Sequence, residues 1–175
     1  MNNQQIVIMG FMGTGKTTVA QGLARRLNCQ AIDLDDLITQ RETRGPKEII
    51  EQDGEVAFRL IETKILGEVL REASARVLSV GGGAWTIAEN RQMILEHGAF
   101  TVWLDAPFEP CWKRIEAGCQ ARPLARSRKL AQTLYAARRP LYALADARIA
   151  VFENESAEEI ATKVATAVLG QNANT

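Results

Sequence analysis

A glycine-rich segment directly follows a short apolar run near the N-terminus. Residues 10–17 read G-F-M-G-T-G-K-T, and residues 6–9, I-V-I-M, precede them. This segment satisfies the pattern G-x-x-x-x-G-K-[ST], which cradles phosphate groups when it joins a buried strand to a helix. A strand, a phosphate-binding loop (P-loop) and a helix in this order indicate an α/β sheet domain. A glycine turn that ends in Lys-Thr by chance is the alternative.

The chemistry of these residues predicts nucleotide binding. Glycines let successive backbone N–H groups point at phosphates, and the N-terminus of the following helix adds a partial positive charge. Lys16 would reach the β- and γ-phosphates, and the Thr17 hydroxyl would bind the Mg²⁺ that bridges them. The residues expected to contact ATP are Gly13, Thr14, Gly15, Lys16, Thr17 and Thr18.

Apolar periodicity extends this interpretation to the whole chain. Short apolar runs, typical of buried parallel strands, alternate with segments of helical spacing. Strands are predicted at residues 6–9, 31–33, 77–80, 100–104 and 148–152. Helices are predicted from about residue 16, at 55–72, 108–117 and 127–143, and near the C-terminus. Right-handed crossovers between parallel strands then give a three-layer α/β/α fold with a five-stranded parallel sheet.

Length and composition predict one soluble domain. The chain has 175 residues, 46% hydrophobic and 24% charged, and neither a linker nor a repeat divides it. Residues 1–175 are therefore expected to form a single domain, with its core at about 4–170. No apolar run is long enough to cross a membrane, and the first residues lack the positive charge of a signal peptide. The three cysteines show no disulfide or zinc pattern, so we expect a cytoplasmic protein.

Charge is unevenly distributed along a chain whose formal net charge is zero. Residues 112–140 contain eight basic residues and a single acidic one. An anionic ligand is expected there, although solvated helix faces would give the same pattern. The isoelectric point of about 6.6 argues against nucleic acid as that ligand.

Polar residues at the ends of later strands predict an acceptor site. Asp33 and Asp35 follow the second strand, and side chains two apart on an extended segment share a face. One carboxylate would face Mg²⁺ and the other a hydroxylated acceptor; a helix N-cap is the alternative for such an aspartate. Arg59 adds a cation, and residues 81–83, G-G-G, add backbone donors. Together they indicate a kinase for a polyol acid.

Five further blocks accompany the P-loop in a fixed order. They are D-x-D at 33–35; G-E at 54–55, followed by F-R at 58–59 and E at 62; L-S-x-G-G-G at 78–83; R-P-L at 122–124; and R-x-P-L-Y at 138–142. With these blocks the chain resembles the shikimate kinase family over nearly its whole length. The resemblance implies a P-loop NTPase fold of the nucleoside-monophosphate-kinase type, with ATP as co-substrate and Mg²⁺ as cofactor.

The resemblance also implies an acceptor-binding region at about 33–62, together with substrate-binding residues later in the chain. Asp35 would hold the ring hydroxyls of shikimate. Arg59 and Arg138 would clamp its carboxylate. The same pocket would be lined by Gly81, Gly82 and Gly83.

Catalytic roles follow from the resemblance in the same way. Asp33 would act near Mg²⁺ and as a base toward the 3-hydroxyl. Lys16 would be a second catalytic residue, at the phosphates. Arg122 would descend onto the transferring phosphate from a mobile lid at about 118–129. Arg114 would stack on adenine.

The chain departs from the family pattern at a few positions. Thr39 stands where Glu is common, and Gly45-Pro46-Lys47 replaces a G-x-S-I-like stretch. The spacing from Arg114 to Arg122 is one residue longer than usual, and Ala125 replaces a Leu. Outside the blocks, Asp105 imitates a Walker B aspartate, but it precedes Ala-Pro, and we favour a helix N-cap.

The sequence therefore predicts ATP-dependent phosphorylation of the 3-hydroxyl of shikimate, giving shikimate 3-phosphate and ADP in aromatic amino acid biosynthesis. The alternatives are a related P-loop kinase for gluconate or a nucleoside monophosphate, and a non-catalytic nucleotide-binding module. We expect a monomer that binds neither nucleic acid nor membranes.

Overall fold

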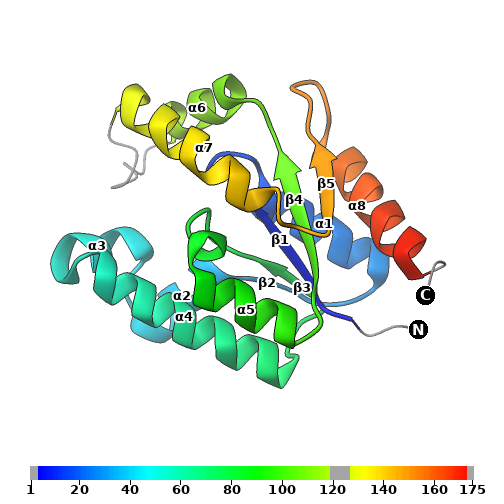
Figure 1. Cartoon of the computed structure of the whole chain (residues 1–175), viewed down its shortest axis with the longest axis horizontal. Coiled ribbons are helices and arrows are strands. Elements are labelled where there is room, and N and C mark those ends of the chain that lie inside the picture. Colours follow the sequence, from blue (N-terminus) through cyan, green and yellow to red (C-terminus); the bar gives the residue numbers. More distant parts are fainter. Residues whose placement is uncertain (1–3, 119–126, 173–175) are drawn as a thin grey trace.

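The computed structural model of this protein describes residues 4–118 and 127–172. Its five strands form one parallel sheet in the order β2-β3-β1-β4-β5 (Figure 1). The strands are β1 (Ile6–Gly10), β2 (Ala31–Asp33), β3 (Val77–Ser79), β4 (Phe100–Asp105) and β5 (Ala147–Ala150). The helices are α1 (Lys16–Leu27), α2 (Leu34–Glu42), α3 (Pro46–Asp53), α4 (Glu55–Glu72), α5 (Ala88–Glu96), α6 (Phe108–Ala117), α7 (Arg128–Tyr142) and α8 (Ala157–Asn172), with a 3₁₀ turn, η1 (Ala84–Thr86).

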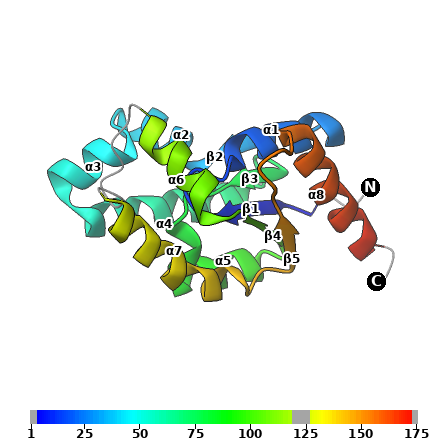
Figure 2. The ribbon, with the colours of Figure 1, turned by 90° about the horizontal axis from the view of Figure 1, so that it is seen from above.

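Strand β1 lies at the centre of the sheet and is buried on both faces. Its residues Ile6, Val7, Ile8 and Met9 are all 0% exposed, and it pairs with β3 on one side and β4 on the other. Burial of such a run from both sides is a main source of the hydrophobic stabilisation of the fold. Figure 2 shows α1 and α8 on one side of the sheet, and α4, α5 and α7 on the other. The three-layer α/β/α prediction is confirmed.

The predicted elements agree closely with the observed ones, with differences near the second strand. Helix α2 begins at Leu34, directly after β2, and neither α2 nor α3 was among the predicted helices. Pro46 occupies the start of α3, where its fixed φ favours a helix and its missing N–H costs no hydrogen bond. None of the helices in the described part of the chain is long and apolar enough to cross a bilayer.

The carboxyl ends of the parallel strands meet at one edge of the sheet. The P-loop follows β1, Asp33 ends β2, the loop at 81–83 comes just after β3, and Asp105 ends β4. Ligands of open α/β sheets bind outside this edge. The topology therefore brings most of the predicted site residues to one place.

Candidate active site

The P-loop is a tight turn between β1 and α1 that only glycine can form at two positions. Gly13 and Gly15 have φ values of 79° and 90°, in the left-handed region that favours glycine. A side chain at Gly13 would also meet the Cys111 carbonyl oxygen at 2.6 Å. The loop thus lies against α6 and presents its backbone at the N-terminus of α1.

The polar side chains of the loop turn toward its own backbone. Lys16 Nζ donates a hydrogen bond to the Phe11 carbonyl at 3.0 Å, and Thr14 Oγ1 donates to the same oxygen at 2.6 Å. Thr18 is exposed on the first turn of α1. The ammonium group of Lys16 is therefore held against the backbone of the loop, at the end of α1 that favours a phosphate.

Thr17 and Asp33 are brought together, as the predicted metal site requires. Thr17 Oγ1 donates a hydrogen bond to Asp33 Oδ2 at 2.6 Å. Asp33 is also the N-cap of α2, because its Oδ1 accepts from the backbone N–H of Asp35 at 3.0 Å. Both the metal-site and the N-cap interpretations therefore fit the geometry. Burial and the negative charge of Asp33 raise the pKa of neighbouring Asp36.

Asp35 reaches the acceptor side by a different geometry from the one predicted. The expectation that Asp33 and Asp35 share the face of an extended segment is wrong, because the N-cap turns the chain into a helix at Leu34. Asp35 stands in the first turn of α2, and a side chain built at Gly81 would meet its Oδ1 at 3.1 Å. The carboxylate thus faces the glycine loop after β3.

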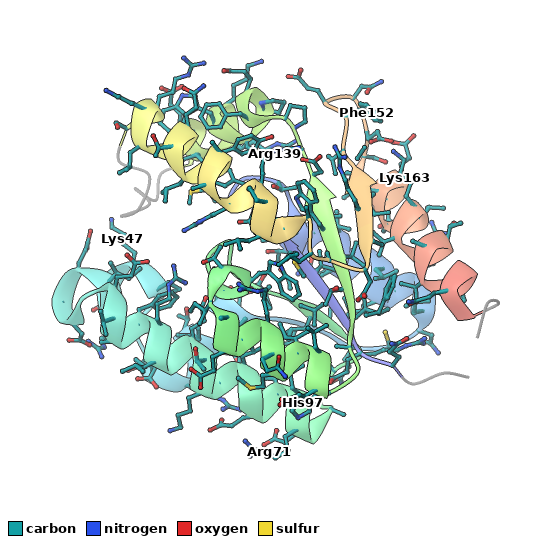
Figure 3. The ribbon with its side chains drawn as sticks, in the orientation of Figure 1. Lys47, Arg71, His97, Arg139, Phe152 and Lys163 are labelled. Carbon is teal, nitrogen blue, oxygen red and sulfur yellow. The ribbon has the colours of Figure 1, made fainter. Side chains whose placement is uncertain are left out.

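A cavity of about 690 Å³ opens between α2, α3, α4, the glycine loop and α7. The P-loop contributes Met12 to its wall, so the cavity adjoins the phosphate-binding turn. All the predicted acceptor residues line it: Asp35, Arg59, Gly81, Gly82, Gly83 and Arg138. Lys47 and Thr39 line it too, and Lys47 projects from α3 toward α7 (Figure 3). The departures from the family pattern at Thr39 and at Gly45-Pro46-Lys47 therefore lie in the wall of this cavity.

Arg59 is held in the cavity by two glutamates of its own helix. Its Nη1 pairs with Glu62 at 2.6 Å and its Nη2 with Glu55 at 3.2 Å. A Cβ at Gly83 would lie 2.3 Å from Arg59 Nη2, so a side chain there would displace the guanidinium from this position. Glu62 is fully buried, and burial raises its pKa to about 7 against the opposing charge of Arg59. Sequence reasoning gave Glu62 no role, although its i,i+3 spacing from Arg59 was a usable signal.

Arg138 approaches the cavity from α7 and is 7% exposed. Tyr142, one turn later, links it to the glycine loop: its hydroxyl donates to the Gly82 carbonyl at 2.5 Å. Burial raises the pKa of Tyr142 to about 12, and a hydrogen bond with Arg138 opposes that rise. Asp35 of α2, Arg59 of α4 and Arg138 of α7 thus converge on one cavity.

The comparisons with known proteins agree with this geometry. A family model described as shikimate kinase matches residues 12–169. The shikimate kinase of Ruegeria pomeroyi is 38% identical over 169 residues, which cover 95% of this chain and 85% of the relative. The chain belongs to the shikimate kinase family. The solved structure of shikimate kinase from Acinetobacter baumannii in complex with shikimate is similar at a TM-score of 0.86 and 32% identity, covering 96% of this chain and 94% of that one.

A more distant solved structure shows how far the fold extends beyond the family. A gluconokinase from Sinorhizobium meliloti is similar at a TM-score of 0.67 and 20% identity, covering 98% of this chain and 95% of that one. At this identity the likeness concerns the fold alone. Assignment of this chain to the shikimate kinase family rests on the closer matches.

Of the two arginines that the family resemblance assigns to the nucleotide, the structure describes Arg114 but not Arg122. Arg114 lies on α6 and donates from Nη1 to the Gly13 carbonyl at 3.0 Å, so it borders the P-loop. Arg122 lies outside the described residues, as do Ala125 and most of the predicted lid. Arg128 and Lys129, which the prediction placed in the lid, begin α7.

Asp105 does not have the role that we favoured from the sequence. The N-cap of α6 is Pro107, without a side-chain cap bond. The Asp105 carboxylate instead accepts hydrogen bonds from Arg139 of α7 and Arg148 of β5. The N-cap prediction is therefore wrong, because two cations from distant elements reach this carboxylate.

Proposed function

We propose that this protein transfers the γ-phosphoryl group of ATP to the 3-hydroxyl of shikimate, giving shikimate 3-phosphate and ADP. The observation that carries the proposal is the cavity beside the P-loop, which combines Asp35 with Arg59 and Arg138. A carboxylate suits hydroxyl groups, paired guanidinium groups suit a carboxylate, and the adjoining loop suits phosphates. Shikimate carries both acceptor groups. The reaction would be a step of aromatic amino acid biosynthesis.

Acceptor binding divides between the two sides of the cavity. Asp35 accepts hydrogen bonds from ring hydroxyls, while Arg59 and Arg138 hold the carboxylate of shikimate in a charge-assisted clamp. Gly81, Gly82 and Gly83 let the substrate approach the backbone closely. Because Arg59 Nη1 is already fixed by Glu62 at 2.6 Å, its fork is oriented before the substrate arrives, which reduces the cost of ordering it.

Nucleotide binding falls to the P-loop and its neighbours. Backbone N–H groups of residues 13–18 and the ammonium of Lys16 hold the phosphates, with the partial charge of the α1 N-terminus. Arg114 packs against the adenine ring from α6. Arg122 would add a cation to the transferring phosphoryl group.

The Thr17 hydroxyl and the Asp33 carboxylate fit a Mg²⁺ ion that enters with ATP. Mg²⁺ is usually bound by one or two protein oxygens, several waters and substrate phosphates, and these two oxygens lie 2.6 Å apart beside the P-loop. When bound, the ion neutralises charge on the β- and γ-phosphates. Thr17 and Asp33 would therefore hold the cation that offsets the negative charge of these phosphates.

Asp33 receives the proton of the 3-hydroxyl or acts through the metal. Phosphoryl transfer has a loose transition state, so positioning and charge neutralisation contribute more than a strong base. Asp33 is held from both sides, by Thr17 on one oxygen and by the N–H of Asp35 on the other. It can therefore orient both the metal site and the helix that carries Asp35.

An assay of ADP release separates this proposal from its alternatives. The purified protein with ATP and Mg²⁺ is offered shikimate, gluconate or nucleoside monophosphates in turn. We expect turnover with shikimate only, because Asp35 would repel the phosphate of a nucleotide acceptor. Turnover with gluconate or a nucleoside monophosphate alone would show that this compound, and not shikimate, is the acceptor. Turnover with none of the three would favour a non-catalytic nucleotide-binding module. We further propose a cytoplasmic monomer.

A further inference from the structure

Asp105 lies at the carboxyl end of β4, next to the catalytic edge of the sheet, and is held by two arginines. Arg139 makes two bonds to it, Nη1 to Oδ1 at 2.5 Å and Nη2 to Oδ2 at 3.1 Å. Arg148 adds a bond from Nε to Oδ2 at 2.8 Å. The Asp105 side chain is only 7% exposed. Removal of one partner from an ion pair this buried is strongly destabilising.

Aromatic rings complete the surroundings of Arg139. Its guanidinium lies 5.0 Å from the centre of the Trp103 ring and 5.3 Å from that of Tyr135, within the range of cation–π attraction. Its Nη1 also donates to the Tyr135 hydroxyl at 2.8 Å. Figure 3 shows Arg139 between α7 and the end of β4. Arg139 thus ties α7 to the sheet by hydrogen bonds, charge and ring contacts.

The position of Arg139 in the helix gives this tie a consequence for the acceptor cavity. Arg138 is the preceding residue, and consecutive helical residues point about 100° apart around the axis. With Arg139 fixed on β4, Arg138 is turned into the acceptor cavity, whose wall it forms. The next residue is Pro140, inside α7, which lacks the N–H that would bond the preceding turn. This part of the helix therefore has one backbone hydrogen bond fewer, and the side-chain contacts of Arg139 add to its attachment to the sheet.

We propose, on the basis of the shikimate kinase activity proposed above, that Arg139 is a positioning residue whose ion pair with Asp105 sets the direction of Arg138 in the acceptor cavity. Arg139 does not line the cavity; it acts through its neighbour. A purely structural ion pair would stabilise the fold without changing how shikimate binds. The KM for shikimate distinguishes these two possibilities, whereas a change in stability is expected from both.

Arg148 provides a matched control within the chain. It bonds the same Asp105 oxygen at 2.8 Å and lies 5.2 Å from the same Trp103 ring. It belongs to β5, however, and its side chain is 63% exposed. Removal of Arg148 therefore takes a cation from Asp105 without loosening α7.

The test compares Arg139→Gln, Arg148→Gln and wild type by kcat, by KM for each substrate and by melting temperature. We expect Arg139→Gln to raise KM for shikimate by about tenfold, since small misplacements of a binding group are costly, with KM for ATP nearly unchanged. Arg148→Gln should leave both KM values near those of wild type. Arg139→Lys, which keeps the charge but loses the two-pronged geometry, should fall between Arg139→Gln and wild type.

Three outcomes would decide against the inference. An unchanged KM for shikimate in Arg139→Gln, with only a lower melting temperature, would make the pair purely structural. An equal rise of KM in Arg148→Gln would show that the effect passes through Asp105 and not through α7. If Arg139→Gln does not fold, Arg139→Lys decides, and a wild-type KM there overturns the inference. Absence of shikimate turnover in the wild type would instead overturn the proposed function.

Discussion

Replacement of Glu62 with glutamine should make the stability of this protein less dependent on pH. The Glu62 side chain is fully buried, and its Oε2 pairs with Arg59 at 2.6 Å. Its Oε1 has no hydrogen-bond partner within the described residues. Burial raises its pKa from 4.5 to about 7, which outweighs the opposing charge of Arg59. Because the pKa is higher in the folded state, the folded protein binds more protons between these values, and stability falls as the pH rises through them.

The size of the effect follows from the pKa shift. With about 1.4 kcal/mol for each pKa unit, the whole shift corresponds to about 3.5 kcal/mol, and ionisation of Glu62 should lower the free energy of unfolding by about 2.5 kcal/mol between about pH 5 and about pH 8. Glutamine does not ionise, so Glu62→Gln should lack this loss. Urea unfolding of both proteins across the range measures the difference, and other titrating groups cancel in the comparison.

Glu55→Gln is the matched control for this experiment. Glu55 is the other partner of Arg59, at 3.2 Å, but its side chain is 47% exposed. Exposed ion pairs contribute little to stability, so the gap between this variant and wild type should stay nearly constant with pH. A constant gap between Glu62→Gln and wild type would refute the reasoning, since it would mean that Glu62 is ionised throughout in the folded protein.

Four further predictions concern activity. Lys16→Ala should abolish measurable turnover while circular dichroism shows an intact fold; an unchanged kcat would refute the role of Lys16. Asp35→Asn should raise KM for shikimate by about tenfold, as charge-assisted hydrogen bonds contribute about 1.5–3 kcal/mol each; a change confined to KM for ATP would place Asp35 at the metal. Arg59→Lys or Arg138→Lys should weaken shikimate binding despite the retained charge, and wild-type binding in both would refute the clamp. Arg122→Ala should lower kcat by about 10³ or more with little change in nucleotide affinity, and the reverse pattern would make it a nucleotide-binding group.

The features that the sequence predicted correctly have local signals. Strand β1 is a continuous apolar run, and the glycine pattern of the P-loop directly follows it. The position of residues 81–83 at the edge of the sheet where ligands bind follows from parallel topology, because every strand ends on the same side. The roles of these residues came from the family resemblance and are still to be tested.

The features that the sequence did not reveal depend on competition between local structures or on contacts between distant elements. Asp33 favours both a strand end and a helix N-cap, and the cap sets the chain into α2 one residue later, which moves Asp35 onto a helix. Asp105 and Arg139 are 34 residues apart, so no periodicity connects them. The pKa of Glu62 reflects burial by tertiary packing, which a motif does not encode.

The position of the transferred phosphoryl group on the product tests the proposed phosphorylation of the 3-hydroxyl of shikimate. The protein is incubated with ATP, Mg²⁺ and shikimate, and the product is examined by phosphorus–proton correlation NMR. We expect one new phosphate ester whose phosphorus couples to the proton on carbon 3 of the shikimate ring, in amounts equal to the ADP formed. A phosphorus coupled to another ring proton, or ADP accompanied only by inorganic phosphate, would contradict it.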